Sequence, residues 1–154
     1  MSLPRNRDIL SKTINHKSLG KDKGLARLGD SITNLVYSLA ISLIMRRPEG
    51  LRASDKILSQ ALTEAGLRYM APKRARSGDL GDVAESLIAS AWLGNMIDIE
   101  DAASVVASEF NEEDLKDRKK GDLSAIKGFK KLLNNIMEHI DQQAMISPPD
   151  KQRS

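Results

Sequence analysis

Cysteine is absent from this chain of 154 residues, and histidine occurs only twice. Without cysteine there are no disulfides, no thiolate zinc sites and no cysteine nucleophile. His16 and His139 are far apart in the sequence and lack the spacing of an imidazole metal site, which gives little support to a zinc centre or a serine triad. A metal ion, if one is bound, would therefore be held by oxygen ligands.

Aromatic residues and long apolar runs are also scarce. Aromatics are 3% of the chain, which argues against single-stranded nucleic-acid binding by base stacking. The longest apolar stretch, residues 35–45, contains two serines and is shorter than the roughly 20 residues that cross a bilayer, so we expect a buried helix and no membrane partner. The opening residues, MSLPRNRD, lack the apolar segment of a secretory signal, and we expect a cytoplasmic protein.

Alternating strand patterns are missing as well, and apolar residues recur instead at intervals of three and four. This spacing predicts helices over residues 22–47, 54–69, 79–95, 98–110 and 124–143, with Ser54 as an N-cap and Gly94 as a helix end. A composition of 40% hydrophobic and 29% charged residues is typical of a folded globular chain. We therefore predict one all-α domain over residues 20–143, with an N-terminal segment at 1–19 and a flexible tail at 144–154.

Basic residues are unevenly placed, although the net charge is only +3. One cluster precedes the apolar part of the first helix, a second precedes the third helix, and a third lies before the last helix: Lys17, Lys21, Lys23 and Arg27; Lys73, Arg74 and Arg76; Lys116, Arg118, Lys119 and Lys120. Such clusters favour polyanion binding, but most charge runs are simply solvated loop faces. On their own they are weak evidence for a nucleic-acid partner.

Three acidic residues stand in the most apolar predicted helices. Asp30 follows Gly29 in the middle of the first helix, where a glycine costs roughly 1 kcal/mol relative to alanine and suggests a close helix crossing. Asp82 and Glu85 are three residues apart, so both carboxylates lie on one face of the third helix. This spacing alone is weak evidence, because other acidic pairs in the chain share it. An unpaired carboxylate in an apolar helix is costly, however, and needs a cation or hydrogen bonds.

Three converging carboxylates would suit Mg²⁺, with Mn²⁺ as a substitute. Hard divalent cations take oxygen ligands, and Mg²⁺ commonly uses one or two carboxylates together with waters and substrate phosphate oxygens. Such a site performs phosphodiester chemistry, because the metal provides hydroxide near neutral pH and stabilises charge on the leaving oxygen. No side-chain nucleophile is then needed, which agrees with the absence of cysteine.

Two segments resemble the signatures of ribonuclease III. GLARLGDSITNLV at residues 24–36 is similar to the signature in which a Leu-Gly-Asp-Ser/Ala core opens an apolar helix. GDVAESLIASAWLG at residues 81–94 looks like the other signature, Asp-x-x-Glu followed by an Ala/Ser-Leu-Ile-Gly/Ala run. The segments occur in the family's order, and the resemblance extends over residues 20–110. It implies a dimeric all-α endonuclease domain in which Asp30, Asp82 and Glu85 surround the catalytic metal, with Asp30 and Glu85 as the more direct ligands.

Ala26 departs from the family pattern, which usually has a glutamate four residues before the Leu-Gly-Asp aspartate, one helical turn earlier. Asp22, two turns before Asp30, is a poorly placed substitute. The minimal bacterial relatives called Mini-III, which the chain resembles in its Gly-Leu-Ala lead-in, also tolerate a small residue at this point. The resemblance to Mini-III therefore makes Ala26 compatible with activity.

The 44 residues after Phe110 are too few and too helical for the appended RNA-binding module of full-length ribonuclease III. We therefore expect the catalytic domain itself to bind the RNA. The family implies a homodimer whose two sites share a groove that fits A-form double-stranded RNA. The first helix, including Leu25 and Leu28, is the candidate dimer surface. Lys73, Arg74 and Arg76 match a basic loop of Mini-III and are the first candidates for phosphate contacts, with Lys23 and Arg27 as further RNA-binding residues.

The resemblance thus predicts a metal-dependent endoribonuclease that cleaves double-stranded RNA by phosphodiester hydrolysis, acting as a homodimer without a separate RNA-binding domain. The alternative, motivated by Ala26, is a catalytically inactive ribonuclease III-like domain that serves as an RNA-binding or ribosome-associated scaffold. A third interpretation is an unrelated all-α interaction protein in which both motifs are coincidental core patterning.

Overall fold

The computed structural model describes residues 20–146, with side chains described for residues 20–142. Five α-helices follow one another along the chain: α2 (Lys23–Met45), α3 (Asp55–Glu64), α4 (Ser77–Leu93), α5 (Ile99–Ala107) and α6 (Arg118–Ile146). Two short 3₁₀ helices, η2 (Arg68–Met70) and η3 (Glu112–Lys116), lie between them, and residues 20–146 contain no strand. The all-α prediction is confirmed. The predicted N-terminal segment 1–19 and residues 147–154 of the predicted tail 144–154 lie outside the described residues, while residues 144–146 of that tail belong to α6.

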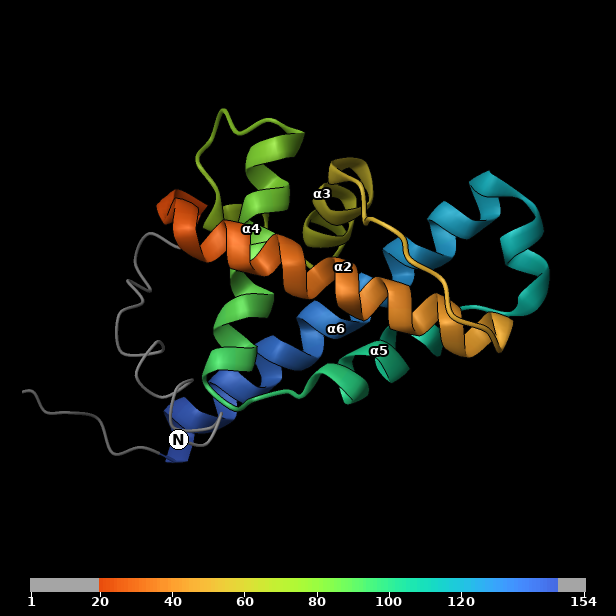
Figure 1. Ribbon diagram of the computed structural model, residues 1–154. Helices are drawn as coiled ribbons and strands as arrows, with labels where there is room; N and C mark the ends of the chain where they lie inside the picture. Colours follow the sequence, from red (N-terminus) through yellow and green to blue (C-terminus); the bar gives the residue numbers. More distant parts are fainter. Residues whose placement is uncertain (1–19, 147–154) are drawn as a thin grey trace, which may run out of the picture.

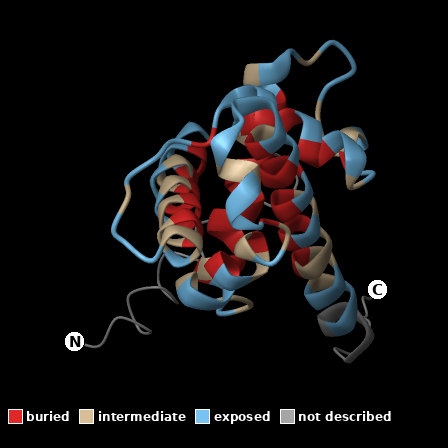
Figure 2. Ribbon diagram, turned by 90° about the vertical axis from the view of Figure 1, so that its right-hand side faces the viewer, coloured by how far each residue is buried: buried red, intermediate tan, exposed pale blue. Residues whose placement is uncertain are grey.

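The helices pack around one apolar core (Figure 1). α2 lies across α4 and also contacts α5, whereas α3 packs on α4 and α6. Buried residues gather where the helices face one another (Figure 2). On α6, Phe129 and Leu133 are fully buried, and the Phe129 ring meets that of Tyr37 on α2 edge to face, with centroids 5.8 Å apart. The last helix therefore completes the core, as its apolar stripe indicates.

By length and composition alone, α2 would also qualify as a membrane-spanning helix, but buried core helices of soluble proteins meet the same criteria. Here the helix buries one side against its neighbours. Val36 and Ala40 have no exposed surface, and α4 and α5 both pack against this helix. Its apolar character is thus explained, on this side, by the core of the domain.

Two helices differ from their predicted bounds by five residues or more at one end, for local reasons, and the other three differ by at most three residues. α3 ends at Glu64 instead of near residue 69, because Gly66 adopts a positive φ of 79° that ends the helix. α6 begins at Arg118, ahead of the predicted start at residue 124. The Asp117 carboxylate accepts a hydrogen bond from the Lys119 N–H at 2.9 Å and so caps a charged first turn that has little apolar periodicity. The N-cap at Ser54 and the end of α4 at Gly94 are confirmed.

The apolar surface of α2 differs from the one expected for a dimer. Leu25 is buried within its own protomer, and Leu28 packs against the same core. The leucines of α2 that remain exposed are Leu35 and Leu43, at 49% and 57%. Leu25 was therefore wrong as an interface residue, because it is buried in the core of its own chain. Leu28 is only partly buried, and its place at a dimer surface stays a prediction.

Candidate active site

Asp30 is positioned on α2 by a neighbour one turn further along the helix. The side-chain amide of Asn34 donates a hydrogen bond to Asp30 Oδ1 at 3.1 Å. The amide oxygen of Asn34 accepts a second bond, from the backbone N–H of Ala53, at 2.9 Å. Asn34 thus orients the Asp30 carboxylate and also ties the segment that leads into α3 to the same turn of α2.

Gly29 lies where α2 crosses α4. A Cβ atom at this position would overlap the backbone carbonyl of Glu85 and lie 3.0 Å from the Glu85 Cβ. Only a residue without a side chain fits between the two backbones, which confirms the close helix crossing expected from glycine in mid-helix. The crossing brings the two signature segments into contact at Gly29 and Glu85, one residue away from Asp30.

Asp82 and Glu85 are separated by less than one turn of α4 but have different surroundings. Asp82 is partly exposed, and its Oδ2 lies 3.4 Å from Lys23 Nζ on α2. Glu85 is only 6% exposed. No lysine or arginine in the described part of the chain forms an ion pair with Glu85. On one face of α4, the Asp82 carboxylate is therefore partly solvated and the Glu85 carboxyl is buried.

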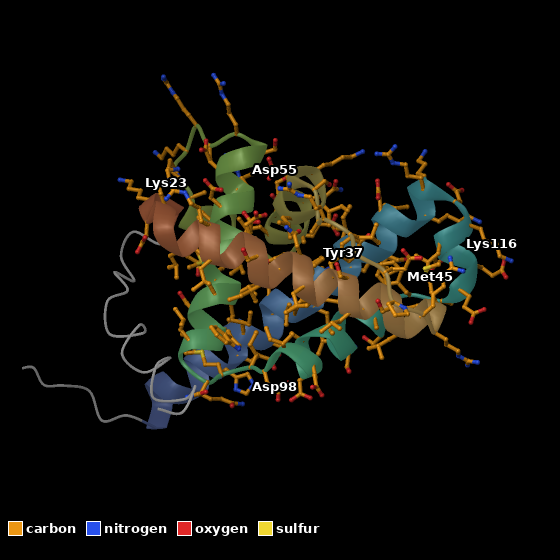
Figure 3. The ribbon with its side chains drawn as sticks, in the orientation of Figure 1. Lys23, Tyr37, Met45, Asp55, Asp98 and Lys116 are labelled. Carbon is orange, nitrogen blue, oxygen red and sulfur yellow. The ribbon has the colours of Figure 1, made fainter. Side chains whose placement is uncertain are left out.

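A cavity of about 320 Å³ joins these residues, formed where α2, α4 and the start of α3 meet. Its lining consists of four acidic and three basic side chains together with one alanine: Asp30, Asp55, Asp82 and Glu85; Lys23, Arg27 and Arg52; and Ala26. All three acidic residues predicted from the sequence line it. In Figure 3, Lys23 at the start of α2 and Asp55 at the start of α3 both lie near the N-terminal half of α4.

Two lining residues were missed by the sequence analysis. Arg52 lies in the loop before α3 with Nη2 3.8 Å from Asp30 Oδ2, and Asp55 is the first residue of α3. Neither belongs to a signature segment, and an aspartate that follows a serine N-cap looks like an ordinary helix start. The signal available in the sequence was that a basic and an acidic residue, Arg52 and Asp55, stand on either side of the Ala53-Ser54 pair that precedes the predicted helix.

The remaining basic candidates are separate from the cavity. Lys73, Arg74 and Arg76 are exposed in the loop before α4, and none of them lines the cavity. The loop is held by the Arg68 guanidinium, which donates to the Pro72 and Lys73 carbonyls at 3.1 and 3.2 Å. Asp82 follows in the second turn of α4. The structure thus places Lys23 and Arg27, on α2, in the lining of the cavity. The loop cluster of Lys73, Arg74 and Arg76 lies at the N-terminal end of α4, the helix that carries Asp82 and Glu85.

The donor set suits a hard divalent cation, although it is not preassembled. Within residues 20–146, no group of three histidine, aspartate or glutamate side chains is arranged to hold a metal ion as it stands. The side chains of the cavity that could bind a metal ion are nevertheless all carboxyl groups, whose oxygens are the ligands that hard divalent cations take. One of them is the buried Glu85 carboxyl, which forms no ion pair within the described residues. The side chains of Asp30 and Asp82 are 43% and 31% exposed, so an ion entering the cavity from solvent can reach both carboxylates.

Burial and three neighbouring carboxylates together raise the pKa of the Glu85 carboxyl from an ordinary value of 4.5 to about 8. Loss of hydration is the largest cause, because it disfavours the charged form. The hydrogen bond between Glu85 and Asp30, and the negative charge of Asp30, raise this pKa further. Asp82 and Asp55 contribute through their charges in the same direction. In the metal-free protein, Glu85 is therefore mostly protonated at neutral pH.

We expect the free energy of unfolding of the metal-free protein to fall as the pH rises from about 4.5 to about 8. In this interval the unfolded chain has already released the Glu85 proton while the folded protein still holds it, so a higher pH favours the unfolded state. The expected slope approaches roughly 1 kcal/mol per pH unit. Urea unfolding in a chelating buffer measures it. The Glu85→Gln variant should show a flatter dependence, and an unchanged slope would contradict the assignment.

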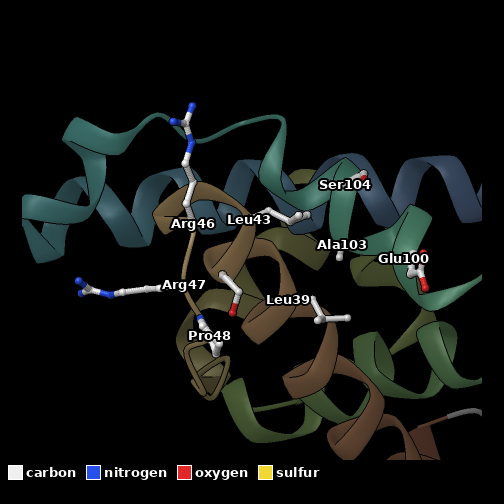
Figure 4. Close-up of a pocket in the computed structure, with 9 residues that line it drawn as sticks. Leu39, Leu43, Arg46, Arg47, Pro48, Glu100, Ala103 and Ser104 are labelled. Atoms are coloured by element: carbon white, nitrogen blue, oxygen red, sulfur yellow. The ribbon is translucent and has the colours of Figure 1, made fainter.

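A second hollow of about 630 Å³ lies at the other end of α2, against α5 (Figure 4). Its apolar lining includes Leu39 and Leu43 of α2, and its charged lining residues are Arg46, Arg47 and Glu100. It contains a single acidic side chain. It lacks the paired carboxylates that metal-assisted phosphodiester chemistry requires, so the smaller cavity between α2 and α4 is the candidate active site.

Comparison with known protein families agrees with this geometry. The family model described as Ribonuclease III matches residues 23–142, which includes both signature segments and all five helices up to residue 142 of α6. No curated protein matches the chain. The family match covers more than half of the sequence, and the structure places its two signatures at one cavity. The chain belongs to the ribonuclease III family.

Proposed function

We propose that this protein is a divalent-metal-dependent endoribonuclease that cleaves double-stranded RNA as a homodimer. The observation that carries the proposal is the meeting of Asp30, Asp82 and Glu85, from two distant segments, at one cavity. Family membership supports a ribonuclease with an RNA substrate. The metal, the duplex preference, the dimer and a cytoplasmic location are parts of the proposal.

The acidic side chains would hold Mg²⁺ or Mn²⁺, with Glu85 and Asp30 as direct ligands and Asp82 beside them. When bound, the cation would supply Lewis-acid activation of water and of the phosphate. In the hydrolysis, a water oxygen forms a bond to phosphorus, one phosphorus–oxygen ester bond of the backbone breaks, and the leaving oxygen receives a proton. Asn34 keeps Asp30 in place through its 3.1 Å hydrogen bond during this reaction.

Basic residues at the cavity would bind the RNA backbone. Lys23, Arg27 and Arg52 line the cavity itself, and the side chains of Lys23 and Arg52 are 63% and 82% exposed. Their pairs with Asp82 and Asp30 are solvated and weak, so a phosphate can replace the carboxylates as the partner. The loop cluster of Lys73, Arg74 and Arg76 extends the basic surface toward neighbouring phosphates.

Dimer formation has a possible surface on α2. Leu35, Leu39 and Leu43 recur every four residues and so form one stripe along the helix. Leu35 and Leu43 are among the few large apolar side chains that are exposed in the described part of the chain. Burial of this stripe against a second copy would remove it from water.

Cleavage of a labelled RNA duplex, beside a single-stranded control, tests the proposal. We expect cutting of the duplex only when Mg²⁺ or Mn²⁺ is present, and a rate about 100-fold lower for Asp30→Asn, because loss of a direct ligand should exceed the 10–100-fold cost of losing an outer-shell group. Glu100→Gln, in the second hollow, is the matched control and should cut like the wild type. Light scattering on the same preparation reports whether the protein is a dimer.

Binding of the duplex without cutting under any metal would favour the alternative, a catalytically silent RNA-binding domain. Ala26 motivates this alternative, because it lines the cavity in place of the glutamate usual in the family. An Asp30→Asn variant that cuts as fast as the wild type would reject the proposed site.

A further inference from the structure

Asp55 lies against the part of α4 that carries the two signature carboxylates. A Cβ atom at Gly81 would lie 3.0 Å from Asp55 Oδ1, and one at Gly78 would lie 3.7 Å from Asp55 Oδ2. Gly81 immediately precedes Asp82 and stands one helical turn before Glu85. The two glycines therefore leave room for the Asp55 carboxylate on the same side of α4 as the active-site cavity.

The position of Asp55 is set by the N-cap of its own helix and by a hydrogen bond between the preceding loop and α2. Ser54 caps α3 by accepting the Ile57 N–H at 3.2 Å, which orients the first turn. The Ala53 N–H is bound by Asn34, the residue that also orients Asp30. The start of α3 is thus linked through one side chain to a predicted metal ligand. Asp55 lines the cavity from the start of α3.

The other candidate for a fourth acidic group does not serve. Asp22 uses its carboxylate to cap α2, accepting the Leu25 N–H at 3.0 Å, and it does not line the cavity. Ala26, at the position of the family's usual glutamate, does line the cavity and is 6% exposed. The cavity thus has an alanine on α2 where a carboxylate is usual and an additional carboxylate on α3.

We infer that Asp55, on α3, supplies the fourth acidic group of the metal site. It takes the place of the family's usual glutamate on α2, where this chain has Ala26; the inference rests on the proposed function. A second observation points to a cation at this place. Glu85 is more than nine-tenths buried and lines the same cavity, and its side chain is hydrogen-bonded to another carboxyl, that of Asp30, while it forms no ion pair with a basic residue within the described residues. A buried carboxyl of this kind gains most from a cation held jointly with neighbouring acidic groups.

Metal titration of the full chain, without RNA, tests the inference. Mn²⁺ binding is followed by the electron paramagnetic resonance signal of the free ion, and Mg²⁺ by competition. We expect Asp55→Asn to weaken Mn²⁺ binding about 10-fold or more, because it removes the negative charge and one of the two carboxylate oxygens. Asp55→Glu should retain part of the affinity. Glu64→Gln, an exposed acid at the far end of the same helix, should change binding less than about 2-fold.

The double variant Ala26→Glu/Asp55→Asn provides a rescue, since it returns the carboxylate to α2. We expect it to bind Mn²⁺ within a few-fold of the wild type, with circular dichroism used to verify folding. If it does not fold, the comparison of Asp55→Asn with Asp55→Glu still decides. Wild-type affinity in Asp55→Asn would overturn the inference while leaving the proposed function intact. Absence of Mn²⁺ binding by the wild type would instead overturn the proposed function.

Discussion

In the Glu85→Gln variant, we expect the rate of metal-dependent RNA cleavage to fall by about 100-fold or more. The substitution removes the charge that the most buried carboxyl of the cavity, a proposed direct metal ligand, would carry with the ion bound. Glutamine has nearly the same size and can still hydrogen-bond to Asp30, so the helix crossing should remain. A gel-based assay on an RNA duplex at saturating Mg²⁺ measures the loss. Cleavage at the wild-type rate would show that Glu85 is not part of the catalytic site.

The same variant should be more stable than the wild type when no metal is present. At pH 8 the folded wild type must ionise a buried carboxyl whose pKa is raised to about 8, whereas glutamine carries no charge. We expect a gain of about 2 kcal/mol in the free energy of unfolding in a chelating buffer. The exposed Glu64→Gln variant should show no such gain. Lower stability of Glu85→Gln at pH 8 would mean that Glu85 acts through packing instead of charge.

The Gly29→Ala variant is expected to lose about 3 kcal/mol of stability, at the upper end of the usual cost of overpacking. The added methyl group would meet the Glu85 backbone carbonyl, which cannot turn away as a flexible side chain can. α2 and α4 must therefore move apart, and the gain in helix propensity from replacing glycine, about 1 kcal/mol, does not compensate. Chemical unfolding followed by circular dichroism measures the loss.

Gly24→Ala is the matched control for this prediction. Gly24 lies in the same helix, is exposed, and a Cβ atom there would have only Asp22 Oδ1 nearby, at 3.6 Å. We expect it to leave stability unchanged or raise it by up to about 1 kcal/mol. If both glycine variants were equally stable, the crossing at Gly29 would not constrain the fold. Because Gly29 adjoins Asp30, cleavage by Gly29→Ala should fall along with stability.

The sequence predicted well whatever depends on local periodicity. The intervals between apolar residues located all five helices, and glycine beside Asp30 indicated the close crossing that the structure contains. Errors arose where the local signal was weak. The first turn of α6 is charged, and its start depends on the Asp117 cap. The end of α3 depends on the positive φ of Gly66.

Asp30, Asp82 and Glu85 were found because their motifs are contiguous in the sequence. Arg52 and Asp55 belong to no motif. They reach the cavity because α3 packs on α4 and because Asn34 binds the backbone of Ala53, which ties the loop before α3 to α2. Their spacing along the chain carries no information about this contact, since it forms across a loop and between two helices. A hydrogen bond between distant segments therefore helps to place two of the charged residues that line the cavity.

The sequence by itself determined the helical class, the ribonuclease III signatures and an oxygen-only donor set, because these follow from residue type and short-range spacing. Only the tertiary structure decided that Leu25 faces its own core, that Glu85 is buried deeply enough to hold a proton at neutral pH, and that Asp55 reaches the cavity. A helix's pattern defines which of its faces is apolar. Which partner meets each face depends on how the helices cross, and contacts between distant segments fix that crossing.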